Sequence, residues 1–315
     1  MKTVSAHIVT FNSEAYIRDC LEAVFKQSYP IERIIVIDNN SQDNTLAILS
    51  EFEDRITIVT NPVNVGFAPA HNQAILLSDC DYFLILNPDV KLHPDYISEL
   101  ISVSENDELI GSLTGKLVLS SSPDKIDSTG LEITKARRAF DRGAGEPSGQ
   151  WETSEEVFGV SGAAALYNAE MVKDISLNND FFDNDFFAYK EDVDVAWRAR
   201  LLGWKAFYCA DAVAFHERGW KKESRSKIPL KIRRYSYINR YKMILKNDHW
   251  LFIIKHLIPF LAYEIPSWGY FLLKEPSVLG SWKAFGSNFK KSLQKRRWIQ
   301  SKRRAEYENV YSFFR

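Results

Sequence analysis

The stretch Tyr82–Leu86 constrains the fold more than any other part of the chain. Its five consecutive apolar residues are too few for a typical buried helix and are rich in aromatic and branched side chains, so they predict a strand buried on both faces. Pro88 fixes its own φ and pushes Asn87 towards an extended conformation. Asp89 would then lie at the carboxyl end of a central strand, where open α/β sheets bind ligands. Taken alone, these residues fit an ordinary turn equally well.

Alternating strands and helices precede this strand. Pro30 ends the first helix, which Asn12-Ser13 can cap. Because the alternation is the pattern of βαβ units, we expect an α/β fold with a mostly parallel sheet and its ligand edge above the strand ends. The predicted strands are 4–10, 33–37, 56–59 and 82–86, and the predicted helices lie between Ser13 and Pro30 and over 45–52 and 70–77.

The middle of the chain contains two segments with the composition of loops. Residues 120–123 and 141–149 are rich in Ser, Gly and Pro and show no core-forming pattern. One of them could form a flap over a bound ligand, although a passive surface loop is the commoner outcome. The remaining predicted elements of this part are a helix over 95–109 and strands over 113–119, 157–167 and 204–214.

Charge divides the chain into two regions. Residues 1–217 contain 17 Lys and Arg against 35 Asp and Glu, whereas residues 218–315 contain 23 against 6. We therefore predict a catalytic domain over 1–217 and a basic, helical appendage over 218–315. An acidic region suits a cation site, and a basic region suits an anionic surface.

Cysteine usage and the N-terminus indicate the compartment. Cys20, Cys80 and Cys209 are far apart and odd in number, which argues against a disulfide framework and fits a reducing environment. The N-terminus lacks the long apolar segment and the cleavage site of a signal peptide. We expect a protein of the cytoplasm, or of the cytoplasmic face of the cell membrane.

Four polar motifs follow predicted strands in order. They are Val9-Thr10-Phe11-Asn12, the run Val36 to Asp43, Asn64-Val65-Gly66-Phe67-Ala68 with Asn72, and Leu86-Asn87-Pro88-Asp89. Together these motifs resemble the signatures of family 2 glycosyltransferases. This resemblance implies an inverting enzyme with the nucleotide-diphospho-sugar transferase fold called GT-A, and the Asn-Pro-Asp form of the last motif most resembles the rhamnosyltransferase-like branch.

The donor nucleotide needs directional hydrogen bonds, which Asp38 and Asn40 at a strand end can supply. The same residues can also cap the next helix. Gly66 fits either a donor contact or a turn that requires positive φ. The donor-binding residues that the resemblance implies are Thr10, Asn12, Asp38, Asn40, Asn64, Gly66, Asn72, Asn87 and Arg198.

The donor diphosphate needs a counter-charge, and Asp89 is the expected ligand of a divalent cation, Mg²⁺ or Mn²⁺. One carboxylate makes a sparse metal site, with room for phosphate and water. A lone His is usually structural. The resemblance nevertheless implies that His216 lies close to the metal and the diphosphate.

Glu191 and Asp192 open a helix that the spacing of Val193, Ala196 and Trp197 predicts. Carboxylates in a first turn are explained by the helix dipole alone. The aromatic residues before them, however, would desolvate a carboxylate and raise its basicity, as a general base requires. The resemblance implies that Asp192 is the base, with Glu191 beside it in the catalytic pair.

The appendage contains an apolar and aromatic run over 250–273 that charges and prolines interrupt. A spanning helix needs about 20 mostly apolar residues, so we expect an interfacial, partly re-entrant helix pair on an anionic membrane surface. A solvated helical surface is the alternative. No nucleic-acid recognition motif is present. The residues assigned to headgroups and anionic lipid are Trp268, Tyr270, Trp282, Trp298, Lys290-Lys291, Lys295-Arg296-Arg297 and Lys302-Arg303-Arg304.

The expected reaction is the metal-dependent, inverting transfer of a sugar to a hydroxyl of a lipid-linked saccharide during cell-surface polysaccharide assembly. By resemblance the sugar is L-rhamnose and the donor dTDP-β-L-rhamnose. Another donor such as a UDP-hexose is the alternative within this class. From other classes, the alternatives are a non-catalytic nucleotide-sugar-binding module and a nucleotidyltransferase.

Overall fold

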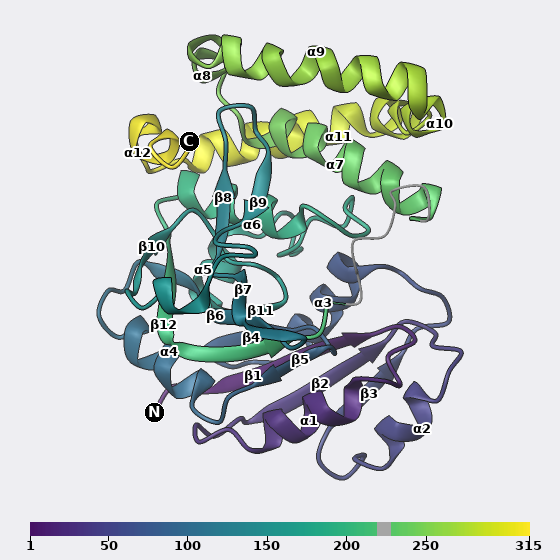
Figure 1. Ribbon diagram of the computed structural model, residues 1–315, viewed down its shortest axis with the longest axis vertical. Helices are drawn as coiled ribbons and strands as arrows, with labels where there is room; N and C mark the ends of the chain where they lie inside the picture. Colours follow the sequence, from purple (N-terminus) through teal and green to yellow (C-terminus); the bar gives the residue numbers. More distant parts are fainter. Residues whose placement is uncertain (219–227) are drawn as a thin grey trace.

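The computed structural model describes residues 1–218 and 228–315. A mixed sheet and its helices form one half of the molecule, and helices α7–α12 stack at the other end (Figure 1). The sheet runs in the order β10-β12-β6-β11-β4-β1-β2-β3, with β5 paired to β12 and β7 paired to β6.

The parallel half of the sheet agrees with the prediction. Strand β1 pairs with β2 and β4, and β2 pairs with β3, all in parallel. Every residue of β4 is buried, as its unbroken apolar run indicates. The strands that follow β1 in the sequence lie on both sides of it, β2 on one side and β4 on the other. The carboxyl ends of β1, β2 and β4 therefore meet at one edge of the sheet. These strands are β1 (Val4–Thr10), β2 (Arg33–Asp38), β3 (Thr57–Thr60) and β4 (Tyr82–Leu86).

The other half of the sheet is mixed, because β11 runs antiparallel to β4 and β6 while β12 runs parallel to β6. The strand predicted over 157–167 is wrong as a single element: two strands form, separated by a segment that contains Gly159 and Gly162. A Cβ on Gly159 would lie 2.2 Å from Ala196, so the backbone packs directly on helix α6 there. The strands are β5 (Val90–Leu92), β6 (Ile110–Leu119), β10 (Glu155–Val157), β11 (Ala164–Asn168) and β12 (Lys205–His216).

The segments predicted as loops are partly structured, and this prediction is wrong for 122–123 and 141. Ile126 is fully buried and Val118 pairs with it in the sheet, so long-range pairing outweighs the loop-like composition. A hairpin that the sequence did not indicate follows and projects towards the C-terminal helices (Figure 1). The elements are β7 (Ser122–Ser128), β8 (Leu131–Ile133), β9 (Ala139–Asp141) and the 3₁₀ helix η1 (Ser148–Gln150).

The helices of the first 217 residues lie close to their predicted positions. The helix predicted over 95–109 ends five residues early, because Asp107 accepts the backbone N–H of Leu109 and starts a turn. The helices are α1 (Ile17–Phe25), α2 (Thr45–Ser50), α3 (Phe67–Leu76), α4 (Tyr96–Ser104), α5 (Ala169–Ile175) and α6 (Glu191–Leu201).

The C-terminal helices share a hydrophobic core with the sheet. Trp197 of α6 contacts the rings of Tyr311 and Phe314, with centroids 6.2 and 5.1 Å away. The backbone N–H of Arg315 donates to the carbonyl of Ile133 in the hairpin. The regions on the two sides of the predicted boundary at 217/218 therefore share one continuous hydrophobic core. The helices are α7 (Leu230–Asn247), α8 (Trp250–Lys255), α9 (Leu257–Lys274), α10 (Pro276–Leu279), α11 (Trp282–Lys302) and α12 (Tyr307–Tyr311).

Buried ion pairs join α6 to the C-terminal helices. Asp183, which precedes α6, binds the ammonium groups of Lys246 on α7 and Lys295 on α11. Lys246 also lies 2.9 Å from Asp194 of α6. Burial opposes ionisation of Asp183, but the two lysines outweigh it and lower the pKa of this carboxyl.

Several side chains that the sequence assigned to lipid contact the protein instead. Lys295 is buried against Asp183, Arg296 donates to two backbone carbonyls, and Arg304 forms an ion pair on the protein surface. Trp298 packs against the main core. The assignment is wrong for Lys295, Arg296 and Trp298, because contacts with distant parts of the chain hold them, whereas Arg304 remains exposed beside Asp174.

Asp183→Ala is expected to destabilise the whole chain. Without Asp183, the buried Lys246 keeps only Asp194 and the buried Lys295 keeps only Asp185 as partners. Removing one partner from a buried ion-pair network costs up to about 3–5 kcal/mol. Urea unfolding measures the change, and Asp124→Ala, at an exposed position, is the control. Equal unfolding free energies for the two variants would contradict this role for Asp183.

Candidate active site

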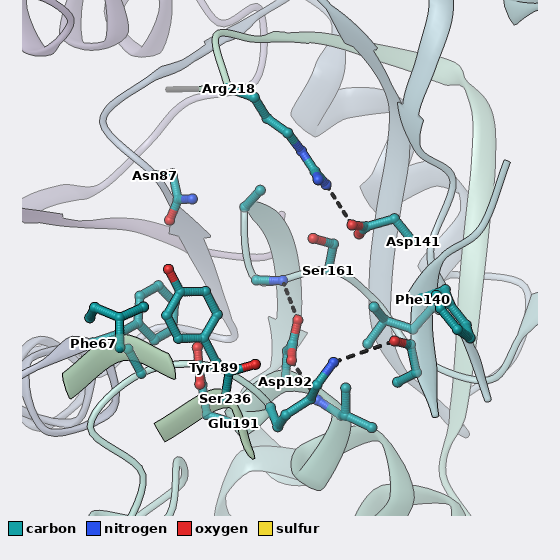
Figure 2. A pocket seen from close by; sticks show the side chains of 18 of the residues that line it. Phe67, Asn87, Phe140, Asp141, Ser161, Tyr189, Glu191, Asp192, Arg218 and Ser236 are labelled. Atoms are coloured by element: carbon teal, nitrogen blue, oxygen red, sulfur yellow. Dashed lines mark hydrogen bonds and ion pairs between the residues drawn. The ribbon is translucent and has the colours of Figure 1, made fainter. Parts of the chain in front are cut away.

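One cavity of about 580 Å³ lies where the sheet, the hairpin and α7 meet. Its walls come from the loop after β4, residues 161–163, the start of α6, the hairpin β8–β9, the end of β12 and α7. Figure 2 shows Asn87, Asp141, Glu191, Asp192 and Arg218 around it. Five of the predicted site residues line this cavity: Asn87, Asp89, Glu191, Asp192 and His216.

Strand pairing places the two predicted metal ligands together. Asp89 follows β4, and His216 is the last residue of β12. Because β5 pairs antiparallel with β12, His216 lies opposite Val90, the neighbour of Asp89. As a result, His216 Nε2 lies 3.4 Å from Asp89 Oδ1.

A charged cluster that the sequence did not indicate holds His216 in place. Asp127 of β7 is buried, and its Oδ2 lies 2.7 Å from His216 Nδ1. Arg218 forms an ion pair with Asp127 and a second one with Asp141 of the hairpin, which Figure 2 shows. Burial opposes the charge on His216, but its contacts with Asp127 and Asp89 outweigh burial and raise its pKa to about 9.

The Asp89–His216 pair has the donor chemistry of a small cation site. Asp89 Oδ1 is buried and has no hydrogen-bond partner, and an imidazole nitrogen faces it. Carboxylate oxygen with imidazole nitrogen suits Mn²⁺, and the carboxylate suits Mg²⁺. Metal binding requires His216 to lose the proton on Nε2, and Asp127 on Nδ1 then fixes the tautomer whose Nε2 can bind a metal. Within residues 1–218 and 228–315, no group of three or more His, Cys, Asp or Glu residues could hold a metal ion, so further ligands would come from phosphate and water.

The backbone before α6 turns sharply to direct two carboxylates into the cavity. Tyr189 and Lys190 both have a φ of 72°, in the left-handed region that side chains rarely adopt. Helix α6 then begins with Glu191 and Asp192. Lys190 Nζ donates to the carbonyl of Ala139, which connects this turn to the hairpin (Figure 2).

The surroundings of Glu191 and Asp192 act differently on the two carboxyl groups. Burial, with the nearby charge of Asp192, raises the pKa of Glu191 to about 8, and its Oε2 has no hydrogen-bond partner. Burial also raises the pKa of Asp192, but this carboxylate accepts the backbone N–H groups of Val193 at 2.8 Å and Gly162 at 3.5 Å. The raised pKa of Glu191 thus favours its neutral form, whereas the backbone N–H groups favour the charged form of Asp192.

Four predicted donor residues lie at the ends of β1 and β2. Thr10 Oγ1 donates to Asp38 Oδ1 at 2.8 Å, and the buried Asp38 also accepts two hydrogen bonds from Ser41. Asn12 and Asn40 have φ values of 53° and 65°, and Asn40 is exposed. These residues share the sheet edge with Asn87 but do not line the cavity.

Two predicted donor residues, Asn64 and Gly66, shape the start of α3. Asn64 Oδ1 accepts the N–H of Gly66 at 2.9 Å. Gly66 has a φ of 96°, and a Cβ there would lie 2.3 Å from the carbonyl oxygen of Phe187. The requirement for positive φ, one of the two interpretations of Gly66, is thus present.

Asn72 and Arg198 lie away from the cavity, contrary to the prediction that they contact the donor. The Asn72 amide is buried and exchanges two hydrogen bonds with the backbone of Phe182. Arg198 is fully buried, bound to Asp194 and to two backbone carbonyls. A sequence motif does not distinguish an Arg that faces a ligand from one that braces its own helix.

Comparison with known proteins identifies the sequence family. The model of "Glycosyl transferase family 2" matches residues 5–176. The chain is similar to poly-beta-1,6-N-acetyl-D-glucosamine synthase of Staphylococcus epidermidis, with 25% identity over 65% of this chain and 47% of that protein. It is also similar to a dolichyl N-acetyl-alpha-D-glucosaminyl phosphate 3-beta-D-2,3-diacetamido-2,3-dideoxy-beta-D-glucuronosyltransferase of Methanococcus voltae, with 28% identity over 59% and 58%. The matches span about half the length of these relatives.

Solved structures share the fold. GalNAc-T7, crystallised with UDP, GalNAc and Mn²⁺, aligns over 100% of this chain and 59% of its own, with a TM-score of 0.66 and 12% identity. The mannosyltransferase PcManGT from Pyrobaculum calidifontis, with GDP-Man and Mn²⁺, aligns over 99% and 86%, with a TM-score of 0.52 and 15% identity. The predicted GT-A fold with a C-terminal helical region is confirmed.

Glu191→Gln is expected to make stability less dependent on pH. The native carboxyl holds a proton that the unfolded chain, with an ordinary pKa of 4.5, has lost, so the native protein loses stability as pH rises from 4.5 to about 8. Gln stays neutral throughout. The difference in Tm, variant minus wild type, should therefore be at least about 2–4 °C larger in alkaline buffer than in acidic buffer.

Thermal melts across this pH range check the expectation. The matched control is Glu53→Gln, which makes the same substitution at an exposed position. If both variants follow the wild-type pH profile, Glu191 does not carry a raised pKa.

Proposed function

The chain belongs to glycosyl transferase family 2, and we propose that it transfers a sugar, with inversion, from a nucleotide-diphosphate donor to a hydroxyl of a lipid-linked saccharide. One observation carries the proposal: a single cavity contains both the Asp89–His216 pair and the carboxyl group of Asp192. Sugar transfer needs a counter-charge for the departing diphosphate and a base for the acceptor proton. The two groups match these two needs.

Asp89 and His216 would hold a divalent cation, Mg²⁺ or Mn²⁺, which supplies positive charge for the leaving group when bound. The crystallisation of two proteins of the same fold with Mn²⁺ supports this assignment. Asp127 orients the imidazole, and Arg218 contributes a fixed positive charge beside it.

Asp192 would accept the proton of the acceptor hydroxyl as that oxygen attacks the sugar. The amides of Val193 and Gly162 favour the charged form of its carboxyl group, against burial, and fix its orientation. Neutral Glu191 adds no second negative charge beside the attacking oxygen. Attack opposite to the departing diphosphate inverts the anomeric carbon.

Thr10, Asn12, Asp38 and Asn40 would bind the nucleotide at the neighbouring sheet edge, with Asn87 between that edge and the cavity. The proposed donor is dTDP-β-L-rhamnose, on the likeness of the Asn-Pro-Asp motif to rhamnosyltransferases. UDP-sugars are the second candidate, since GalNAc-T7 was crystallised with UDP. A thermal-shift panel of nucleotide sugars with Mn²⁺ separates them, and the true donor should give the larger increase in Tm.

The acceptor is proposed to be a lipid-linked saccharide of a cell-surface polysaccharide, used at the cytoplasmic face of the membrane. The names of the relatives, a polysaccharide synthase and a dolichyl phosphate glycosyltransferase, support this class. No helix within residues 1–218 and 228–315 combines the length and apolar character needed to cross a membrane.

Asp192→Asn is expected to lower kcat by roughly 10²- to 10⁴-fold while donor binding persists, because the amide cannot accept the proton. Initial rates measure kcat, and titration calorimetry measures donor affinity. Glu191→Gln is the matched control and should retain most activity, since Gln resembles the neutral carboxyl. A crippled Glu191→Gln beside a mildly affected Asp192→Asn would reverse the assignment of the base.

A further inference from the structure

Helix α9 exposes one entirely uncharged face. Ile258 and Leu273 are each 83% exposed and Ile265 is 68% exposed, whereas Glu264 and Phe271 on the opposite face are buried. Apart from the exposed Tyr270 and Lys274 at its border, the outward positions of the helix contain only apolar side chains, proline, alanine and glycine. They are Leu257, Ile258, Pro259, Leu261, Ala262, Ile265, Pro266, Trp268, Gly269, Leu272 and Leu273.

The apolar face is too broad for a single helical partner. At 100° per residue its large side chains cover roughly 160° of the helix surface, whereas a coiled-coil seam is a narrow stripe. Trp250, Leu251 and Ile254 extend the exposed apolar surface onto α8. Figure 1 shows α8 and α9 at the outer edge of the molecule, beyond α7 and α11. Such a surface fits a broad, flat apolar environment better than it fits a single helix.

Positive charge surrounds the face. Residues 228–315 contain 18 Lys and Arg against 5 Asp and Glu. Lys255 and Lys274 stand exposed at the ends of α8 and α9, and Lys283 and Lys290 are exposed on α11. An apolar helix face with a cationic border matches the interface of an anionic bilayer.

We propose that the α9 face, defined as the outward apolar residues of α9 with Trp250, Leu251 and Ile254 of α8, lies in the interface of an anionic lipid bilayer and brings the cavity to the membrane-bound acceptor. The second part rests on the proposed glycosyl transfer. The face lies within the run 250–273 that the sequence assigned to the membrane interface, whereas Trp298, Lys295, Arg296 and Arg304, also assigned to it, contact the protein.

Direct contacts link the α9 face to the cavity walls. Arg233 lines the cavity and forms a 2.8 Å ion pair with Glu275, which follows the last residue of α9. In the hairpin, the Arg138 guanidinium stacks on Phe140, a cavity residue, and on Tyr263 of α9, at 4.5 and 4.7 Å. Helix α9 therefore packs directly on elements that form the wall of the cavity.

Vesicle flotation tests the surface. The probe is full-length protein with vesicles of phosphatidylglycerol and phosphatidylcholine at low salt. Ile258→Glu combined with Leu273→Glu should lower vesicle binding at least about tenfold, because two carboxylates then face the hydrocarbon boundary. Leu76→Glu combined with Leu109→Glu is the matched control: it adds the same charge at exposed leucines, 72% and 50% accessible, on the catalytic half. This control should bind as wild type.

Activity assays keep the docking surface separate from the reaction. Both double variants should transfer sugar to a soluble acceptor at the wild-type rate, and only the α9 variant should lose transfer to an acceptor embedded in vesicles. If vesicle binding follows this pattern but no sugar is transferred, the proposed function fails and the docking surface stands.

Three results would overturn the docking surface. The wild type could fail to float with anionic vesicles at low salt. The two double variants could float equally well. Light scattering could show that the wild type is a dimer and that only the α9 substitutions dissociate it. If neither form then bound vesicles, the face would be the contact with a second copy of the chain.

Discussion

The buried ion pairs of Asp183 and Asp194 hold the candidate active site together. Both carboxylates flank the start of α6, and both depend on Lys246 of α7, while Asp183 also binds Lys295 of α11. Buried carboxylates without these lysines would be costly. The position of Asp192 in the cavity therefore depends on helices that follow it by 50 to 100 residues in the sequence, and the basic C-terminal region is part of the site's scaffold.

The sequence was informative where local pattern and chemistry coincide. The unbroken apolar run of β4 and the alternation before it predicted the parallel sheet, and the turn at Asn87 placed Asp89 at the ligand edge. Asp89 and His216 were predicted together only through the family resemblance. The structure supplies the physical reason, which is the antiparallel pairing of β5 with β12.

The parts that escaped prediction depend on contacts between distant residues. Asp127 is 89 residues from its partner His216, and no local pattern marks it as part of the site. Arg198 and Lys295 are charged residues in helices, for which sequence favours a ligand or a surface, yet both are buried against carboxylates. The hairpin β8–β9 is too short to give a periodic signal and is held by the C-terminal end of the chain.

The identity of the products tests most directly whether the cavity performs inverting sugar transfer. The full-length chain would be incubated with a panel of nucleotide sugars, a lipid-linked acceptor and Mn²⁺, and the released nucleotide and the anomeric configuration of the product would be determined. The expected result is one nucleoside diphosphate per new glycosidic bond, inverted configuration, and loss of this metal-stimulated reaction in Asp89→Ala. Release of pyrophosphate, a retained configuration, or unchanged turnover in Asp89→Ala with a chelator present would contradict it.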